Sequence, residues 1–531
     1  MAKFDLSKKE IILFSLILIL SLALKLSKIG EWPVTIDEAL GANAARQIIA
    51  GEIAFYEPAV SYQGQFVQYV LIPATFFFGN DVFFIRFSII IFSILTLLIF
   101  YLFVKRYYNV NIALIAAFVL AFTPNDILIS TTAIEVPIIP FFMMLSLYIF
   151  SFYIRTKKIY YLYALALIFG IGLITRLTFV FFIIAFFASI KIYPTISLPL
   201  MQYFKQIKFK NWFVLGSMLI LGMSPFLYWN SINNFQTATF ILGNLPITQS
   251  KQNLFDVYRN FANGSNNFLL SLDNNYRYGF YELGNEKYSY SIIFLISLTI
   301  FALFPLIDLN KRKKIAGLKT NYYLLINFFV IIALISTITF TAFEFEDYVM
   351  LYPFYSVIIA WSIFSIYKIL KLKQSVLSII FIFVVIVAFS SNLINFVDKY
   401  FKLLDAQNSE PCKTLVTNLL PYLKDTTKTL LVFPTDRYRS IYEFYDPSMT
   451  SSVLVSRYDT PEQSQIRWDN YLKMQNVTYI LINNKCNPEW SRQLNISESF
   501  LQFGAMKNKT IITHKILNVN DFEVLKIATV A

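Results

Sequence analysis

Long apolar runs dominate this sequence, and most of them end at short clusters of lysine and arginine. The first extends from Ile11 to Ile29 after Lys8 and Lys9, and a later one from Ser289 to Ile307 lies just before Lys311. A run of about 20 apolar residues can cross the hydrocarbon core of a bilayer as one helix. Of the 531 residues, 57% are hydrophobic and 15% charged, whereas a soluble domain has about 25% charged residues. The chain is therefore predicted to be a polytopic membrane protein.

The charge and the metal-ligand content exclude two classes of function. The formal net charge is +13, but the basic residues lie in short clusters between spans, where they orient a membrane protein and need not bind a polyanion. No nucleic-acid partner is expected. With one His and two Cys in the chain, the sequence argues against a zinc site built on His or Cys.

The basic clusters also predict the topology, because lysine and arginine favour the cytoplasmic side. Lys8 and Lys9 place the N-terminus inside. The run from Phe66 to Gly79 is short for a span, and if it crossed the membrane, Lys105 and Arg106 would face outward. We therefore expect it to lie at the interface.

The remaining runs give about eleven spans, with the N-terminus cytoplasmic and the C-terminus outside. The predicted spans are Ile11–Ile29, Val82–Val104, Ile112–Ser130, Val136–Tyr153, Tyr160–Ile174, Leu177–Tyr193, Phe213–Ser231, Ser289–Ile307, Tyr322–Thr341, Val349–Tyr367 and Ser375–Ile394.

The fold class is accordingly an all-α polytopic membrane protein with a small C-terminal extracytoplasmic α/β domain. The membrane domain covers residues 1–394 and includes two outer loops, 30–81 and 232–288. The tail, residues 395–531, shows strand-like runs at Thr429–Phe433, Tyr479–Ile482, Thr510–Leu517 and Phe522–Ile527, with a hairpin turn between the last two. Cys412 and Cys486 both lie in this tail, as a disulfide or as two buried thiols.

Acidic residues at the outer ends of spans are the first candidates for chemistry, because burying them near a membrane is costly. Asp37 and Glu38 follow the first span at the start of a predicted helix, where the structural alternative is capping of that helix. Glu135 lies at the outer end of another span, where the alternative is a solvated loop acid.

Basic residues on the outer side oppose the positive-inside trend and form the second group of candidates. Arg176 lies between two short spans and is suited to hold a phosphate, the alternative being an arginine that extends to the interface. Arg277 lies in the aromatic stretch Tyr276–Glu282, which suits a sugar or lipid-phosphate site but also an interfacial tyrosine belt.

The order of these features resembles the GT-C membrane glycosyltransferases, specifically the protein O-mannosyltransferase and aminoarabinose-transferase-like group (glycosyltransferase family 39 and relatives). The resemblance rests on an acidic pair after the first span, an interfacial helix ending in Phe-Gly, an arginine opening the next span, an outer acid heading a later span, and a Gly-Leu-x-x-Leu-Thr-Lys-like stretch. Here these are Asp37-Glu38-Ala39, Phe78-Gly79, Arg86, Glu135 and Gly172-Leu173-Ile174-Thr175-Arg176. The resemblance is strong over residues 10–190 and looser to residue 395.

The pattern departs from the family in two places. Gln63-Gly64-Gln65 stands where relatives often carry a Lys-Pro-Pro-Leu or Gly-Pro-Leu turn, and Asp347 stands where relatives often have an arginine.

The resemblance implies a polyprenyl (dolichyl)-phosphate-linked sugar as donor and transfer to a hydroxyl of a protein, lipid or glycan on the outer face of the cell membrane. Asp37 is then expected to act as general base, with inversion at the sugar. Glu38 and Glu135 are expected to orient the substrate or, with Asp37, to hold a divalent cation such as Mg²⁺ or Mn²⁺. Arg176, Arg86 and Arg277 are the expected ligands of the donor phosphate, with Arg176 the best candidate.

Two other classes of function compete with this hypothesis. A transporter or flippase of lipid-linked sugars would place charged residues within spans near the bilayer midplane, whereas the acids here lie at the outer ends of spans. A non-catalytic membrane scaffold that presents the external tail predicts that Asp37→Ala leaves all activity intact.

Overall fold

The computed structural model describes residues 7–27, 29–30, 34–58, 64–79, 81–192, 208–237, 265, 268–269, 272, 276–278, 281–283, 289–308, 324–332, 345–373, 429–435, 451–455, 478–484, 511–519 and 522–529. The chain divides into two compact units. The larger comprises Met1–Ile29 and Gln47–Phe401, and the smaller comprises Gly30–Arg46 and Lys402–Ala531.

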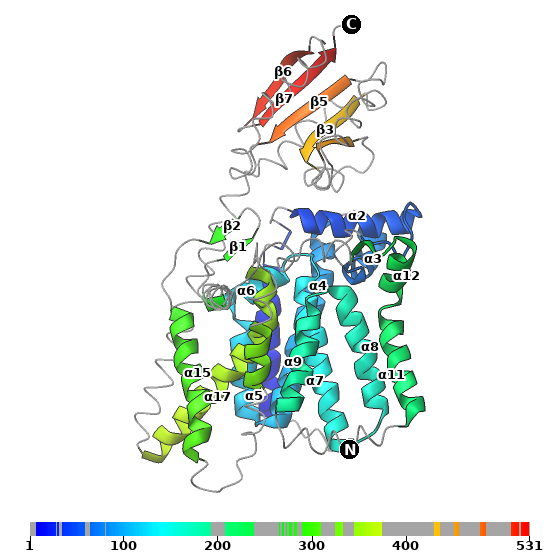
Figure 1. The fold of residues 1–531 in the computed structure, drawn as a ribbon. Coiled ribbons are helices and arrows are strands. Elements are labelled where there is room, and N and C mark those ends of the chain that lie inside the picture. Colours follow the sequence, from blue (N-terminus) through cyan, green and yellow to red (C-terminus); the bar gives the residue numbers. More distant parts are fainter. Residues whose placement is uncertain are drawn as a thin grey trace, which may run out of the picture. The chain divides into compact units, whose positions relative to one another are not determined.

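The larger unit is helical. Its helices are α1 (Lys8–Leu26), α3 (Phe66–Phe78), α4 (Val82–Tyr107), α5 (Val110–Ala121), α6 (Pro124–Ser130), η1 (Val136–Ile138), α7 (Ile139–Thr156), α8 (Tyr160–Thr175), α9 (Phe179–Ile192), α11 (Phe209–Gly222), α12 (Ser224–Ile232), α15 (Ser289–Asp308), η4 (Phe345–Leu351) and α17 (Tyr352–Lys373). Neighbouring helices pack in the order α11, α8, α7, α4, α5, α17, α15, and α1 packs against α4 and α5 (Figure 1). Helix α4 has buried residues at intervals from Ile85 to Val104, so one side of it faces the core along most of its length.

Several predicted spans coincide with long apolar helices. In the part of the chain that the structure describes, three helices are long and apolar enough to cross a membrane, and up to five if each of two bent pairs counts as one span. The three are Val82–Tyr107, Val136–Thr156 and Tyr348–Lys368. The predicted span Ser375–Ile394 lies outside the described residues, and the total of eleven spans stays a prediction.

Two predicted spans are broken by sharp bends. Helices α5 and α6 meet at 60°, and α11 and α12 meet at 71°. Pro124 lies in the first turn of α6 and Pro225 in the first turn of α12. Proline cannot donate a backbone hydrogen bond to the preceding turn, so it ends one helix and begins another. The straight spans predicted over Ile112–Ser130 and Phe213–Ser231 are therefore bent pairs in the structure.

Glycines allow α8 and α11 to cross at close range. A Cβ placed on Gly170 would lie 2.4 Å from the carbonyl oxygen of Leu219, and one placed on Gly222 would lie 2.5 Å from that of Leu167. Small residues at a helix crossing let the two backbones approach and gain van der Waals contact. This contact places α8, and the residue that follows it, against α11.

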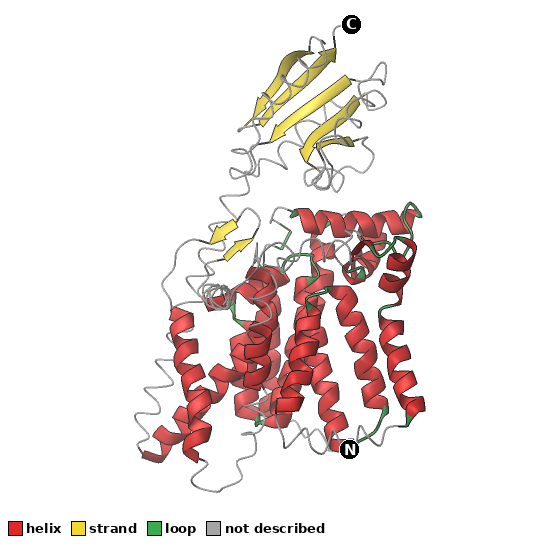
Figure 2. Cartoon of the chain, viewed as in Figure 1, coloured by secondary structure: helices red, strands yellow, loops and turns green. Residues whose placement is uncertain are grey.

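The smaller unit contains a five-stranded sheet in its C-terminal part (Figure 2). The strands are β3 (Thr429–Thr435), β4 (Ser451–Val455), β5 (Thr478–Asn484), β6 (Ile511–Val519) and β7 (Phe522–Thr529), in the order β4-β3-β5-β7-β6. Strand β3 is parallel to β4 and β5, whereas β7 is antiparallel to β5 and β6.

Strands β3, β5, β6 and β7 lie where the sequence predicts strand-like runs, whereas β4 was not predicted. Strands β6 and β7 pair as an antiparallel hairpin from Val519 and Phe522 outward. Parallel neighbours such as β3 and β4 require crossover connections. Those connections, Cys412 and Cys486 lie outside the described residues, so the α/β class of the tail and the disulfide stay predictions. A further two-stranded hairpin, β1 (Tyr276–Tyr278) with β2 (Tyr281–Leu283), belongs to the larger unit.

Candidate active site

Glu135 and Arg176, which the sequence offered as separate candidates, form an ion pair. Arg176 Nη1 donates to Glu135 Oε1 at 2.9 Å. Glu135 precedes η1, which leads into α7, and Arg176 directly follows α8, so the packing of α7 against α8 brings the two side chains together. The Glu135 side chain is 4% exposed and the Arg176 side chain 22%. The carboxylate is thus buried while part of the guanidinium reaches the surface.

The backbone before α3 closes on the same end of α8. A Cβ placed on Gly64 would lie 1.7 Å from the carbonyl oxygen of Ile174 and 3.0 Å from the carbonyl carbon of Thr175. Only glycine permits this approach. Gly64 therefore fixes the start of α3 against the two residues that precede Arg176.

Two glutamines attach α3 to the segment that leads into it. Gln65 Nε2 donates to the Tyr56 carbonyl at 3.2 Å and Gln68 Nε2 to the Glu57 carbonyl at 2.6 Å, and both side chains are fully buried. Sequence reasoning noted Gln63-Gly64-Gln65 only as a departure from relatives. The structure gives Gly64 and Gln65 a positioning role beside α8.

Tyr69 completes this attachment one turn further along α3. Its hydroxyl donates to the Phe55 carbonyl at 2.9 Å, and its ring stacks on Phe55 at 4.2 Å. Burial raises the pKa of the Tyr69 phenol. The hydroxyl therefore stays protonated and keeps donating across the neutral range.

Asp37 and Glu38 lie in the first turn of α2 (Ile36–Ala50). The Thr35 backbone N–H donates to Glu38 Oε2 at 2.8 Å, and the Glu38 N–H donates to Thr35 Oγ1 at 3.3 Å. This reciprocal pair is a capping box. Glu38 is 2% exposed and fixes the helix start, whereas the adjacent Asp37 is half-buried. Helix capping, the structural alternative to a catalytic role for this acidic pair, therefore applies to Glu38.

The other two candidate arginines have different surroundings from Arg176. Arg86 is 1% exposed, and its Nη1 donates to the Ile29 carbonyl at 2.7 Å, just after the end of α1. It satisfies the carbonyl of Ile29, a buried residue three positions beyond the last residue of α1. Arg277 lies on β1, opposite Glu282 of β2 in the antiparallel register.

No group of three or more His, Cys, Asp or Glu side chains able to hold a metal ion occurs among the described residues. Glu38 Oε2 and Glu135 Oε1 already accept hydrogen bonds from Thr35 and Arg176. Each of these carboxylates has a second oxygen, so the divalent-cation set of Asp37, Glu38 and Glu135 stays a prediction.

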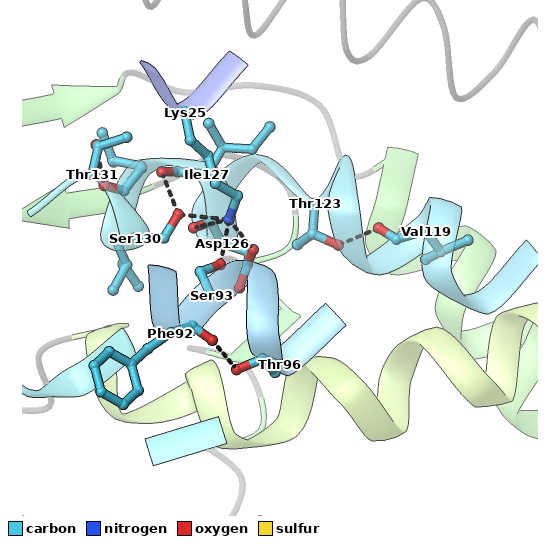
Figure 3. A network of polar contacts seen from close by, with 12 residues as sticks. Lys25, Phe92, Ser93, Thr96, Val119, Thr123, Asp126, Ile127, Ser130 and Thr131 are labelled. Atoms are coloured by element: carbon cyan, nitrogen blue, oxygen red, sulfur yellow. Dashed lines mark hydrogen bonds and ion pairs between the residues drawn. The ribbon is translucent and has the colours of Figure 1, made fainter. Parts of the chain in front are cut away.

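A second charged cluster escaped the sequence analysis entirely. Lys25, in the last turn of α1, is 1% exposed and pairs with Asp126 of α6 at 2.7 Å (Figure 3). The two residues are separated by 101 positions. The only signal in the sequence is a lysine inside an apolar run, which membrane helices tolerate when it has a partner.

Comparison with known proteins supports one family. Residues 64–229 match the family model of dolichyl-phosphate-mannose-protein mannosyltransferases. This range includes Gly64, Arg86, Glu135 and Arg176. No curated protein matches the chain.

Solved structures match over nearly the whole chain. The crystal structure of ArnT from Cupriavidus metallidurans bound to undecaprenyl phosphate matches with a TM-score of 0.65 at 9% identity, covering 96% of this chain and 97% of that one. The apo form of ArnT gives 0.60 at 10% identity with the same coverage. The archaeal oligosaccharyltransferase AglB from Archaeoglobus fulgidus, in complex with an inhibitory peptide and a dolichol-phosphate, gives 0.51 at 14% identity, covering 89% and 69%. The chain therefore has the GT-C glycosyltransferase fold, and its predicted resemblance to the protein mannosyltransferase and aminoarabinose-transferase group is confirmed.

Proposed function

We propose that the chain is an integral-membrane glycosyltransferase that moves a sugar from a polyprenyl-phosphate donor to an acceptor hydroxyl on the outer face of the cell membrane. The observation that carries the proposal is the Glu135–Arg176 pair at the end of α8, within a fold shared with proteins solved in complex with lipid phosphates. The N-terminus in the cytoplasm and the tail outside belong to the same proposal.

Arg176 is the residue we assign to the donor phosphate. When the bond between the sugar and the phosphate breaks, a further negative charge develops on the departing oxygen. A guanidinium already held in place stabilises that charge without reorganising. Glu135 fixes one nitrogen of Arg176 at 2.9 Å, and the 22% exposed fraction of the Arg176 side chain supports access for a ligand. Glu135 thus acts by orienting Arg176.

Asp37 is the residue we assign as general base. It takes the proton of the acceptor hydroxyl while the acceptor oxygen bonds to the anomeric carbon and the bond from that carbon to the phosphate oxygen breaks. Attack opposite the leaving group inverts the configuration. The capping box of Thr35 and Glu38 fixes the helix turn that carries Asp37. We propose no step through a divalent cation.

Arg86 and Arg277 receive different roles in this proposal. Arg86 is buried against the Ile29 carbonyl and holds the chain where it leaves α1. Arg277, on a tyrosine-flanked strand, stays a candidate for contact with the donor headgroup or the sugar.

The test is sugar transfer by the purified full-length protein from a panel of synthetic polyprenyl-phosphate sugars, with the anomeric configuration of the product read by NMR. We expect inverted product from wild type and a loss of about 10²-fold or more for Asp37→Asn. Glu52→Gln, which changes an exposed acid following α2, serves as the control and keeps wild-type activity. Equal rates for Asp37→Asn and wild type would remove Asp37 from the chemistry. Movement of intact donor across vesicles without transfer would favour a flippase.

A further inference from the structure

We propose that Lys25 is a positioning residue for the transfer reaction, which holds α6 and thereby sets the location of Glu135 and of the arginine that Glu135 orients. This inference rests on the proposed function. It concerns a charged cluster that lies apart from Glu135 and Arg176 and that none of the proposed chemical steps uses.

The ammonium of Lys25 joins three helices. Its three short hydrogen bonds reach Ser93 Oγ of α4 at 2.7 Å, Asp126 Oδ2 of α6 at 2.7 Å and Ser130 Oγ of α6 at 2.6 Å (Figure 3). An ammonium has three donors, so each is matched by one acceptor. Lys25 thus binds both ends of the short helix α6 and attaches it to α4.

The surroundings make this arrangement rigid. Lys25 is 1% exposed and the Asp126 side chain 15%. A lysine buried to this degree is strongly destabilising without a partner, so the charged pair holds its geometry. A cavity of about 10 Å³, lined by Ser21, Lys25, Ser93, Thr96 and Asp126 among others, adjoins the pair. It has the size of about one water molecule.

The position of α6 determines that of Glu135. Only four residues lie between Ser130 and Glu135. The first of these are fixed to α6 itself, because Thr131 Oγ1 donates to the Leu128 carbonyl at 2.7 Å and Thr132 Oγ1 to the Ile129 carbonyl at 2.6 Å. A shift of α6 is therefore transmitted through a short, hydrogen-bonded turn to the Glu135 carboxylate.

Helix α4 supplies the fixed side of this arrangement. Ser93 accepts from Lys25, and Arg86, two helical turns or about 10 Å earlier on the same helix, donates to the Ile29 carbonyl. The end of α1 is thus attached to α4 at two points. We infer that losing Lys25 frees α6 while Arg86 still holds the chain where it leaves α1.

The chain offers a matched control. Lys105 and Glu10 form a second lysine–carboxylate pair between α4 and α1, in which the Lys105 side chain is 17% exposed and the Glu10 side chain 4%. Tyr101 also donates to Glu10. Lys105 lies about 18 Å along α4 from Ser93. Lys105→Met removes the same chemistry from the same two helices at the end remote from Glu135.

The experiment measures kcat, KM for the polyprenyl-phosphate donor and thermal stability for Lys25→Met, Lys105→Met, Glu135→Gln and the double variant Lys25→Met with Glu135→Gln. A displacement of about 1 Å at a reacting group lowers the rate by up to about 100-fold. We expect Lys25→Met to lower kcat at least about tenfold and Lys105→Met less than about twofold, with both losing thermal stability. In the Glu135→Gln background the kcat effect of Lys25→Met should disappear.

If Lys25→Met does not fold, Lys25→Met with Asp126→Leu replaces it, because removing both charges leaves no buried unpaired charge. It should fold and show the same kcat defect. Equal kcat losses for Lys25→Met and Lys105→Met, or additive losses with Glu135→Gln, would overturn the inference and leave the proposed function intact. Wild-type kcat in Glu135→Gln would instead contradict the proposed role of Glu135.

Discussion

The replacement of Arg176 by methionine separates the structural contribution of the ion pair from its proposed chemical one. The substitution keeps most of the side-chain volume but leaves the Glu135 carboxylate, 4% exposed, without its guanidinium. Breaking a buried pair in this way costs about 3–5 kcal/mol of stability. Because the Arg176 side chain is 22% exposed, we expect a smaller cost of about 2–3 kcal/mol.

The effect on catalysis should be larger and should not depend on stability. Removing one positioned donor to a developing oxyanion lowers kcat by about 10²–10³-fold, or about 2.7–4 kcal/mol. The kcat of Arg176→Lys should lie between that of wild type and that of Arg176→Met. Lysine keeps the charge, but it lacks the planar guanidinium that can donate to Glu135 and to a phosphate at the same time.

The double variant Arg176→Met with Glu135→Leu decides between the two contributions. It leaves no buried unpaired charge, so its thermal stability should return to near that of wild type. Its transfer rate should stay as low as that of Arg176→Met. The assay is donor turnover together with thermal unfolding in detergent. Recovery of both stability and turnover would show that Arg176 serves only the fold and would refute the reasoning.

Two further predictions concern the glycines that place α8. Gly170→Ala should lower stability by about 1–3 kcal/mol, because the added Cβ would lie 2.4 Å from the Leu219 carbonyl oxygen. The control is Gly216→Ala on α11, where nothing lies within 4 Å of the new Cβ; it should be neutral or slightly stabilising. An unchanged melting temperature for Gly170→Ala would contradict the close crossing. Gly64→Ala should reduce both stability and turnover, because the added Cβ would clash with the Ile174 and Thr175 backbone beside Arg176. Thermal unfolding and donor turnover are the measurements. Wild-type values for both would show that the close approach of Gly64 to this backbone does not matter.

Much of the helical framework follows from the sequence because its signals are local. The interfacial-helix prediction over Phe66–Gly79 corresponds to α3, Phe66–Phe78, and the span predicted from Val82 corresponds to α4. Apolar run length and the flanking turn residues are enough for such elements. The bend before α6 also had a local signal, Thr123-Pro124, which the span prediction did not use.

The candidate site was predicted only residue by residue. Glu135 and Arg176 each stood out, but their ion pair joins positions 41 residues apart and depends on how α7 packs on α8. Lys25 and Asp126 are 101 positions apart, and although each is an ionisable residue inside a predicted span, nothing in either segment identifies its partner. Pairings of this kind are set by helix packing, which a single sequence does not encode in any short window. The contact of Glu38, in contrast, could be predicted from the local sequence, because Thr35-Ile36-Asp37-Glu38 is a recognisable capping pattern.

The central claim is that Arg176, held by Glu135, binds the donor phosphate. Cryo-electron microscopy of the full-length protein with an added polyprenyl phosphate tests it most directly. The account predicts phosphate density within hydrogen-bond distance of the Arg176 guanidinium. Phosphate bound to other residues with Arg176 remote from it would contradict the account.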